Sequence, residues 1–300
     1  MKKVISSILV FILLVVAADF MIGGLVEKSY HASKYGIFHR QNYILNELNE
    51  DIVVLGSSRA CHHYVPSIIS DSLGMSCYNA GSDGMCIYYH YAMLTSMIER
   101  GHIPQIVIYD MLDTDVSTSS GATFTLDAAI ERLMPHYGEF SIIDSLIDLK
   151  GRMEHLKMQS KLYRYNSKLV QLIKCNFIPS PEDNGYEAVF GRLNEDKELQ
   201  KTERLHPTIE ENKVLYFKKL LSLSEKYGFK LILVRSPWYA EIHSASFLLM
   251  KELAEEKGFQ VLDMVNEENL MKPELFKDDS HLNDEGAHLF TRVFVERLDE

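Results

Sequence analysis

The sequence predicts an α/β fold, a doubly wound parallel sheet of about five strands with a helical insertion and an N-terminal transmembrane helix. Three observations predict it. Short apolar runs of strand length alternate with longer amphipathic stretches, one long stretch interrupts this alternation with helical spacing, and the first residues are almost uncharged. Of the 300 residues, 46% are hydrophobic and 24% are charged, which suits a globular chain with a large core.

The amino-terminal segment Val4–Val26 is apolar apart from Asp19. At roughly 20 residues or more, such a segment can span a bilayer, so residues 1–26 are predicted to be a transmembrane anchor. A cleaved signal peptide is the alternative, because Ala17 and Ala18 offer small residues after an apolar stretch. Apolar residues resume after Asp19, which favours the anchor. The very short leading tail favours a single-pass protein of the cell membrane whose body is extracytoplasmic, either periplasmic or extracellular.

After the anchor, residues 27–50 are predicted to be a polar connecting arm, and residues 51–300 a single α/β domain. The strands expected in this domain are mostly rich in Val and Ile, as strands buried on both faces should be. They are Asp51–Gly56, Ser76–Gly81, Gln105–Asp110, Phe229–Arg235 and Phe259–Met264.

Helices are expected between these strands, for example over Thr208–Tyr227 and Ala245–Lys257. Each of the two is followed by a glycine, Gly228 or Gly258, which is a common stop signal after a helix. Alternating strands and helices place ligands at the carboxyl ends of parallel strands. Residues 117–205 contain no convincing buried strand, and their amphipathic pattern predicts a helical cap inserted beside those strand ends, where it would help to shape a substrate site.

Charge and cysteine content exclude several classes of function. The formal net charge is -11 and no cluster of Lys and Arg is visible, which excludes a nucleic-acid partner. Cys61, Cys77, Cys86 and Cys175 show no C-x-x-C spacing and no paired histidines, so no metal site is predicted. Small buried thiols are the simplest interpretation, and a disulfide between two of them stays open for an exported protein.

Two short stretches carry residues that could do chemistry. In "VVLGSSRACHHYVP", Ser57 and Ser58 follow the first predicted strand, where a serine could cap a helix or attack an acyl carbon if a base reached it. In "FKDDSHLNDEGAHLF", Asp278 and Asp279 precede His281. This stretch is either a polar turn that enters a helix or a catalytic base held by a carboxylate.

Three motifs together resemble one family. The stretches "VVLGSSR" after the first strand, "YNAGSDG" after the second and "DDSHLNDEGAHLF" near the end occur in the order used by the SGNH (GDSL-type) hydrolase superfamily. More narrowly, the chain resembles the membrane-anchored, cell-envelope branch of this superfamily, with "GSSR" in place of the Gly-Asp-Ser-Leu signature. The resemblance covers residues from about Asp51 to the end, except the inserted cap, and implies the flavodoxin-like sheet order of the SGNH hydrolase fold.

The resemblance implies a role for each matching residue. The third residue of the Gly-x-Ser signature makes Ser58 the nucleophile. The Asp-x-x-His pair of the family falls on Asp278, which would hold the imidazole, and His281, which would take the proton of Ser58. The backbone N–H groups of Ser58 and Gly81 would cradle the oxyanion. No cofactor and no metal are implied.

The match has one departure. Family members commonly carry Gly-x-Asn-Asp after the third strand, where the asparagine is a further oxyanion donor, and this chain has "VIYDMLDTD" instead. Loss of one such donor costs roughly 10²-fold or more in rate. This departure keeps a second reading open, in which the chain is a non-catalytic or nearly inactive SGNH-fold binding or assembly protein of the envelope.

Other side chains near the motifs are candidates for substrate binding. His62 and His63 follow Ser58 by about one helical turn and, with Arg59, are expected at the mouth of the site. Trp238 follows the fourth predicted strand and could offer an aromatic platform to a sugar, although ordinary packing is the simpler interpretation.

The predicted function is that of a membrane-tethered serine esterase or O-acyltransferase. A Ser-His-Asp triad supports acyl chemistry, and hydrolysis and transfer share the acyl-enzyme step. The resemblance alone implies the substrate, which is an acylated glycan of the cell envelope, with acetyl as the expected acyl group, or another small ester. An acyl-transporting membrane protein is a candidate partner that the sequence does not identify.

Overall fold

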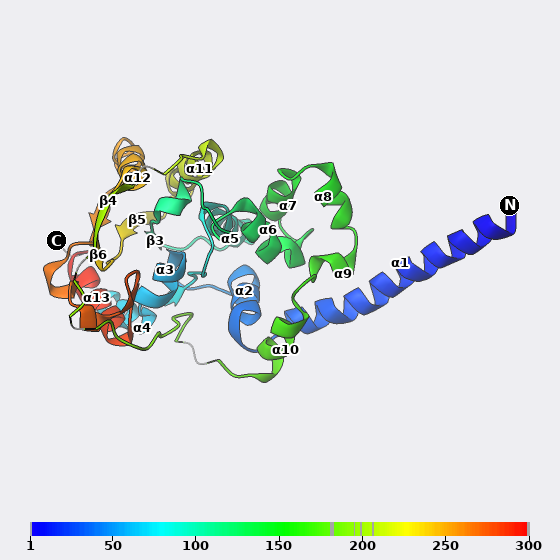
Figure 1. Cartoon of the computed structure of the whole chain (residues 1–300), viewed down its shortest axis with the longest axis horizontal. Helices are drawn as coiled ribbons and strands as arrows, with labels where there is room; N and C mark the ends of the chain where they lie inside the picture. Colours follow the sequence, from blue (N-terminus) through cyan, green and yellow to red (C-terminus); the bar gives the residue numbers. More distant parts are fainter. Residues whose placement is uncertain (1, 181–182, 195, 199, 206, 299–300) are drawn as a thin grey trace. The chain divides into compact units, whose positions relative to one another are not determined.

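The computed structural model describes residues 2–180, 183–194, 196–198, 200–205 and 207–298 (Figure 1). The chain divides into two compact units. Unit 1 combines Met1–Glu47 with Ile130–Ser180, and unit 2 combines Leu48–Ala129 with Pro181–Glu300. Unit 1 is helical, whereas unit 2 contains the sheet, so each unit has its own architecture.

Unit 2 is built on a five-stranded sheet whose neighbouring strands all pair in parallel. The strand order is β2-β1-β3-β5-β7, which is the doubly wound order 2-1-3-4-5 when the strands are counted along the chain. This result confirms the predicted α/β class and all five predicted strands. The observed bounds are β1 Ile52–Gly56, β2 Cys77–Asn79, β3 Ile106–Asp110, β5 Lys230–Arg235 and β7 Val261–Asp263.

Helices pack on both faces of this sheet because alternate strand residues point to opposite sides. Ile52, Val54 and Ile108 belong to the same buried cluster as Phe290 and Phe294 of α13. The intervening strand residues are also buried, and α5 and α11 pack on β1 and β5. The helices of unit 2 are α3 Ser58–His63, α4 Pro66–Leu73, α5 Ile87–Glu99, α11 Glu211–Tyr227, α12 Ala245–Glu255 and α13 Asp284–Glu296.

Glycines end the predicted helices as expected. Gly228 lies directly after α11 with a φ of 77°, in the left-handed region that favours glycine, and Gly258 follows α12 with a φ of 80°. Two smaller strand pairs accompany the sheet. They are β4 Gln200–Leu205 with β6 Ala240–Ser244, in parallel, and β8 Phe276–Asp278 with β9 His281–Leu282, antiparallel.

Unit 1 contains the amino-terminal helix and a group of short helices. Helix α1, Lys2–His31, has 30 residues and a stretch with a mean hydropathy of 2.7, so it is long and apolar enough to span a membrane. Among the described residues, one 3₁₀ turn lies in unit 1, η2 Met134–His136, and three lie in unit 2, η1 Asp113–Asp115, η3 Glu268–Leu270 and η4 Pro273–Leu275. The other helices are α2 Gly36–Asn46, α6 Leu126–Leu133, which crosses the boundary between the units, α7 Ser141–Asp148, α8 Arg152–Lys157, α9 Lys161–Arg164 and α10 Leu169–Phe177.

This division of the chain differs from the predicted one. Residues 27–50 were expected to be a connecting arm, but they form the end of α1 and all of α2, and Tyr30 and Phe38 share a buried cluster with α10. The predicted insertion, 117–205, is helical over its middle part only. Its described residues from 183 onward contain no helix and belong to unit 2. The difference arises because buried contacts between distant segments, rather than local polarity, decide which segments form a unit.

The four cysteines are all buried, and no disulfide joins any two of them. This agrees with the interpretation of the cysteines as small buried thiols.

Candidate active site

The structure places Ser58 on the turn between β1 and α3, with its side chain partly exposed. Gly56 makes this turn at a φ of 141°, which side chains rarely adopt. A Cβ atom at Gly56 would lie 2.8 Å from both the Cβ of Ala60 and the carbonyl oxygen of Asp110. The sequence therefore needs glycine here, both for the turn and for the close approach of β3 to α3.

The predicted triad residues lie in direct contact. The Nε2 atom of His281 is 2.8 Å from the Oγ of Ser58, and its Nδ1 atom is 2.9 Å from an oxygen of Asp278. Asp278 and His281 come from opposite strands of the β8–β9 pair, so a tight turn of the chain brings them together. The structure thus joins residues that are 223 positions apart into one hydrogen-bonded chain.

The hydrogen bonds of Asp278 decide which nitrogen of His281 carries the proton. Its Oδ1 also accepts the backbone N–H groups of Ser280 and His281, each at 3.0 Å. Partial burial alone would raise the pKa of Asp278, but these N–H groups and the imidazole lower it below its usual value. An ionised Asp278 favours the proton on Nδ1 of His281, which leaves Nε2 to accept the proton of Ser58.

Ser280 is a neighbour that sequence reasoning missed. Its Oγ lies 3.0 Å from Oδ1 of Asp278 and 3.0 Å from Nδ1 of His281. The hydroxyl therefore supports the contact between carboxylate and imidazole. Its position inside the Asp-x-x-His spacing is the signal that could have found it.

The backbone N–H of Gly81 does not point to an open oxyanion position in this structure. It donates to the side-chain oxygen of Asn79 at 3.0 Å. A Cβ at Gly81 would lie 2.4 Å from the backbone nitrogen of Cys61, so the glycine allows the loop after β2 to press against α3. The predicted oxyanion role of Gly81 would require this hydrogen bond to be shared or broken. The other predicted donor, Ser58, opens α3, where first-turn N–H groups have no acceptor within the helix.

Asn79 is a second residue without a predicted role. It is fully buried, and its side-chain nitrogen donates to the carbonyl oxygens of Ala60 at 2.7 Å and Tyr64 at 2.8 Å. Asn79 thereby links the end of β2 to the carboxyl end of α3, the helix that begins with Ser58. A polar residue at the end of a buried strand is the signal that indicates such a role.

Arg59 lies in the interior and not at the mouth of the site, where it was expected, with only 2% of its surface exposed. Its guanidinium donates to the carbonyl oxygens of Met111 at 2.7 Å and Ser236 at 3.2 Å, and it lies 3.7 Å from Asp110. The physical reason is electrostatic, because a fully buried carboxylate on β3 needs a nearby positive charge. Trp238 packs on this guanidinium at 5.3 Å, which gives the ring a structural contact independent of any sugar.

His63 is also buried, and both of its ring nitrogens are engaged. Nε2 accepts the backbone N–H of Leu282 at 3.0 Å, so Nδ1 carries the proton and meets the Oγ of Ser236 at 3.1 Å. Ser236 in turn donates to Asp110 at 3.0 Å. Burial holds the pKa of His63 well below its usual value, so the ring is neutral. The network ends beside His281, because Leu282 is the next residue in β9.

The ring of His62 lies closer to the imidazole of His281 than the ring of His63 does. The centroid of the His62 ring is 5.8 Å from that of His281. Nδ1 lies 2.7 Å from the carbonyl oxygen of Glu187 and Nε2 lies 3.2 Å from Asp83. Burial alone would lower the pKa of His62, but Asp83 and the Glu187 carbonyl raise it above its usual value. The segment around Glu187, predicted as part of the cap, thus borders the site as an extended loop.

Two groups of described residues bring three ligand-type atoms within 4.8 Å of one another, Cys61 with His62 and Asp83, and the group His31, His136 and Glu139. The first lies beside the triad, but both ring nitrogens of His62 already contact protein oxygens.

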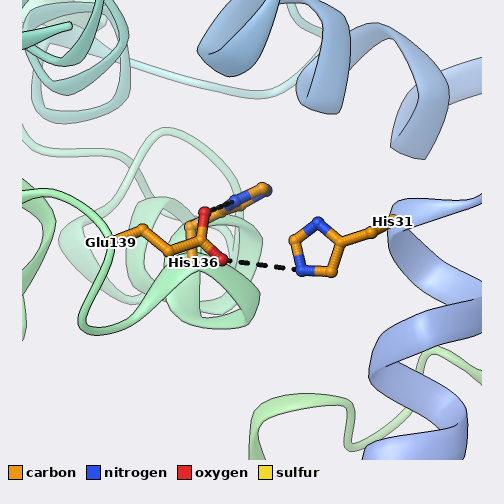
Figure 2. A group of neighbouring side chains, drawn as sticks. All are labelled: His31, His136 and Glu139. Carbon is orange, nitrogen blue, oxygen red and sulfur yellow. Dashed lines mark hydrogen bonds and ion pairs between the residues drawn. The ribbon is translucent and has the colours of Figure 1, made fainter.

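The second group lies in unit 1 and is drawn in Figure 2. There Glu139 contacts His136 at 2.7 Å and His31 at 3.5 Å. Direct hydrogen bonds and ion pairs account for both groups.

No family model matches this chain, and no curated protein matches it in sequence.

Proposed function

We propose that this protein is a membrane-tethered serine esterase or O-acyltransferase. The observation that carries the proposal is the hydrogen-bonded chain from Asp278 through His281 to Ser58. A solvated polar turn would explain Asp278 and His281, but it would not explain why Nε2 meets a serine from the far end of the sequence. Partial exposure of Ser58 and His281 leaves the reacting atoms open to a substrate.

The geometry supports a two-step reaction. The Oγ of Ser58 attacks the acyl carbonyl carbon while Nε2 of His281 takes its proton, and the ionised Asp278 stabilises the resulting imidazolium. The departing alcohol receives that proton, which leaves an acyl-serine. Water or a sugar hydroxyl then attacks the acyl-serine, again with His281 as base, and Ser58 is regenerated. Water gives an esterase and a sugar hydroxyl gives an acyltransferase.

The class of substrate rests on the family resemblance and on α1. The resemblance to the SGNH superfamily supports acyl groups on a glycan of the cell envelope, with acetyl as the expected group. A helix able to span the membrane supports tethering, and an extracytoplasmic body is part of the same proposal. Alkaline phosphatase fused after residue 298 tests the side of the membrane, because it is active only outside the cytoplasm.

One observation favours a second function, a binding or assembly protein with little or no turnover. The N–H of Gly81 is engaged by Asn79. In addition, β3 ends with Asp110, which is buried beside Arg59, and the stretch "VIYDMLDTD" offers no asparagine donor. An oxyanion with fewer donors is stabilised less, so the rate would fall.

A fluorophosphonate probe separates the two functions. On the full chain in detergent, we expect covalent labelling that Ser58→Ala abolishes. Ser57→Ala is the matched control, because the Ser57 hydroxyl is buried and has no partner among the described residues. Its labelling should equal that of the parent. Absence of labelling in a folded parent protein would favour the binding function instead.

A further inference from the structure

One part of unit 1 has a surface unlike that of the rest of the described chain. Among the described residues outside α1, nine large apolar side chains between residues 149 and 178 are exposed, against five in all of unit 2. The same region is basic, with seven Lys or Arg and one Glu between Lys150 and Phe177, although the whole chain carries a net charge of -11. Apolar and basic groups on one surface are typical of proteins that lie on anionic membranes.

Helix α10 shows the pattern most clearly because it has two apolar faces. Leu172 and Cys175 point into the buried cluster that contains Tyr30 of α1. On the other face, Val170, Ile173 and Phe177 are 70%, 61% and 78% exposed. Because one face of α10 packs in the buried cluster, the exposed apolar side chains on its other face are expected to contact a second apolar surface, such as a membrane or a protein.

Helix α8 repeats this pattern on a smaller scale. Met153 and Leu156, one helical turn apart, are 67% and 62% exposed. Lys150, Arg152 and Lys157 flank them and are exposed as well. Side chains of this kind suit a boundary at which acyl chains meet phosphate groups.

The contacts of α1 place these helices at a defined point along the apolar helix. Asp19, inside the apolar run, accepts the Oγ of Ser160 at 2.6 Å and the backbone N–H of Lys161 at 2.9 Å, at the start of α9. A Cβ at Gly23 would lie 2.5 Å from that of Lys161, so the two helices are in close contact. In Figure 1, α9 and α10 lie along the carboxyl-terminal half of α1.

A further contact fixes the end of α1. His31, its last residue, reaches Glu139, which also pairs with His136, and Figure 2 shows Glu139 between the two rings. His136 lies 3.3 Å from the hydroxyl of Tyr30. The carboxyl-terminal part of α1 is therefore packed within unit 1 over about two turns or more.

Only the part of α1 before Asp19 projects from these contacts. At 1.5 Å per residue, Lys3–Ala18 is roughly 24 Å long, somewhat less than the roughly 30 Å hydrocarbon core of a bilayer. If this part enters the membrane, Asp19 and the start of α9 lie at the membrane surface. Helix α10 contacts α1 around Ser29 and Tyr30, roughly 15 Å farther along α1 than Asp19. A tilt of α1, which is common for membrane helices, is therefore needed to bring the exposed apolar side chains of α10 to the same boundary as those of α8.

We propose that α8 and α10 lie in the interfacial region of the membrane that α1 enters, with their exposed apolar side chains at the acyl boundary and Lys150, Arg152 and Lys157 near anionic headgroups. The bilayer is the occupant of this face because α10 contacts the apolar helix α1 and the region is basic. This inference rests on insertion of α1 and is independent of the proposed acyl chemistry.

Spin labels on the full chain in lipid nanodiscs test the proposal. The lipid is phosphatidylcholine with a minor share of phosphatidylglycerol. Single cysteines replace Val170 or Phe177, and Leu248→Cys is the matched control, since Leu248 is 62% exposed and lies in unit 2. The native cysteines are buried, which limits their labelling.

The readout is the accessibility of each label to oxygen, which concentrates in lipid, relative to a water-soluble nickel chelate. We expect the ratio of oxygen to chelate accessibility to be several-fold higher at positions 170 and 177 than at 248. Equal, water-like ratios at all three positions would overturn the proposal and leave this face to a protein partner. Equal, lipid-like ratios at all three positions would show that labels on α10 are no closer to lipid than the control at 248, and would overturn the proposal as well.

Discussion

Each unit of the molecule contains an imidazole paired with a carboxylate, and the two pairs differ in what the second ring nitrogen meets. In unit 2, His281 lies 2.9 Å from Asp278 and 2.8 Å from the Oγ of Ser58. In unit 1, His136 lies 2.7 Å from Glu139 and 3.3 Å from the hydroxyl of Tyr30.

Access to solvent also separates the two pairs. The side chain of His281 is 25% exposed, whereas that of His136 is 0% exposed. Tyr30 is fully buried in a packed cluster, so no substrate can reach its hydroxyl without local unfolding. An imidazole held by a carboxylate is therefore a structural element by default, and it can act as a base only where a nucleophile and an open face are also present.

The largest expected effect comes from removing the two imidazoles in turn. His281→Ala should lower kcat for a p-nitrophenyl ester by on the order of 10⁴-fold or more. The reason is that it removes the base from a proposed triad whose members act together. His136→Ala should leave kcat within a few-fold and lower the free energy of unfolding by about 1–3 kcal/mol, since a buried hydrogen bond to the hydroxyl of Tyr30 is lost. A comparable loss of kcat in both folded variants would remove the distinction between the pairs.

The carboxylate of the unit 2 pair is expected to have the next largest effect. Asp278→Asn should lower kcat by on the order of 10³- to 10⁴-fold, because the amide no longer stabilises the imidazolium and favours the wrong tautomer. Asp279→Asn is the matched control. Asp279 forms an ion pair with Lys197 and should stay within about tenfold of the parent. A dead Asp279→Asn protein with an active Asp278→Asn protein would show that the other aspartate holds His281.

Imidazoles without a carboxylate partner should respond to pH in another way. Burial lowers the pKa of His90 to about 3, so the folded protein keeps this ring neutral while the unfolded chain protonates it near its usual value. The stability due to the neutral ring is complete above about pH 6.5 and is lost as the pH falls toward 3.

Denaturant unfolding at about pH 7 and about pH 4.5 measures this effect. The free energy of unfolding should fall on acidification, and His90→Leu should reduce that fall by about 3 kcal/mol. This magnitude follows because about pH 4.5 lies two units below the usual pKa of histidine. The same fall in the parent and in His90→Leu would show that the ring is protonated in the folded state.

The smallest expected effect tests whether His63 positions the triad. His63→Phe keeps the ring volume but removes the acceptor for the N–H of Leu282, next to His281 in β9. We expect kcat to fall by about tenfold with little change in KM, since a small displacement of a base lowers the chemical rate more than binding. His63→Gln retains an acceptor and should recover part of the loss. Equal activity of His63→Phe and the parent would limit His63 to packing.

Local patterns in the sequence predicted the five strands of the main sheet and helices α11 and α12 of unit 2. Strands β1, β2, β3 and β5 are short runs that the doubly covered sheet buries almost completely, whereas β7 is only partly buried. Gly228 marks the end of α11 through its own backbone preference. The contact of Asp278 with His281 was also predictable, because the two residues are three positions apart on one tight turn. Local patterns of this kind depend on neighbouring residues alone.

The remaining features depend on which distant groups are buried together, so they are visible in the folded chain alone. Arg59 was expected at the mouth of the site because it follows Ser58, yet it is buried beside Asp110, a buried carboxylate that needs a nearby positive charge. Asn79 binds the N–H that Gly81 was expected to offer, and the packing of Tyr30 against α10 makes a supposed connecting arm part of a helical unit. A buried polar group must find its partner wherever the fold places one, and no local pattern in the sequence specifies that place.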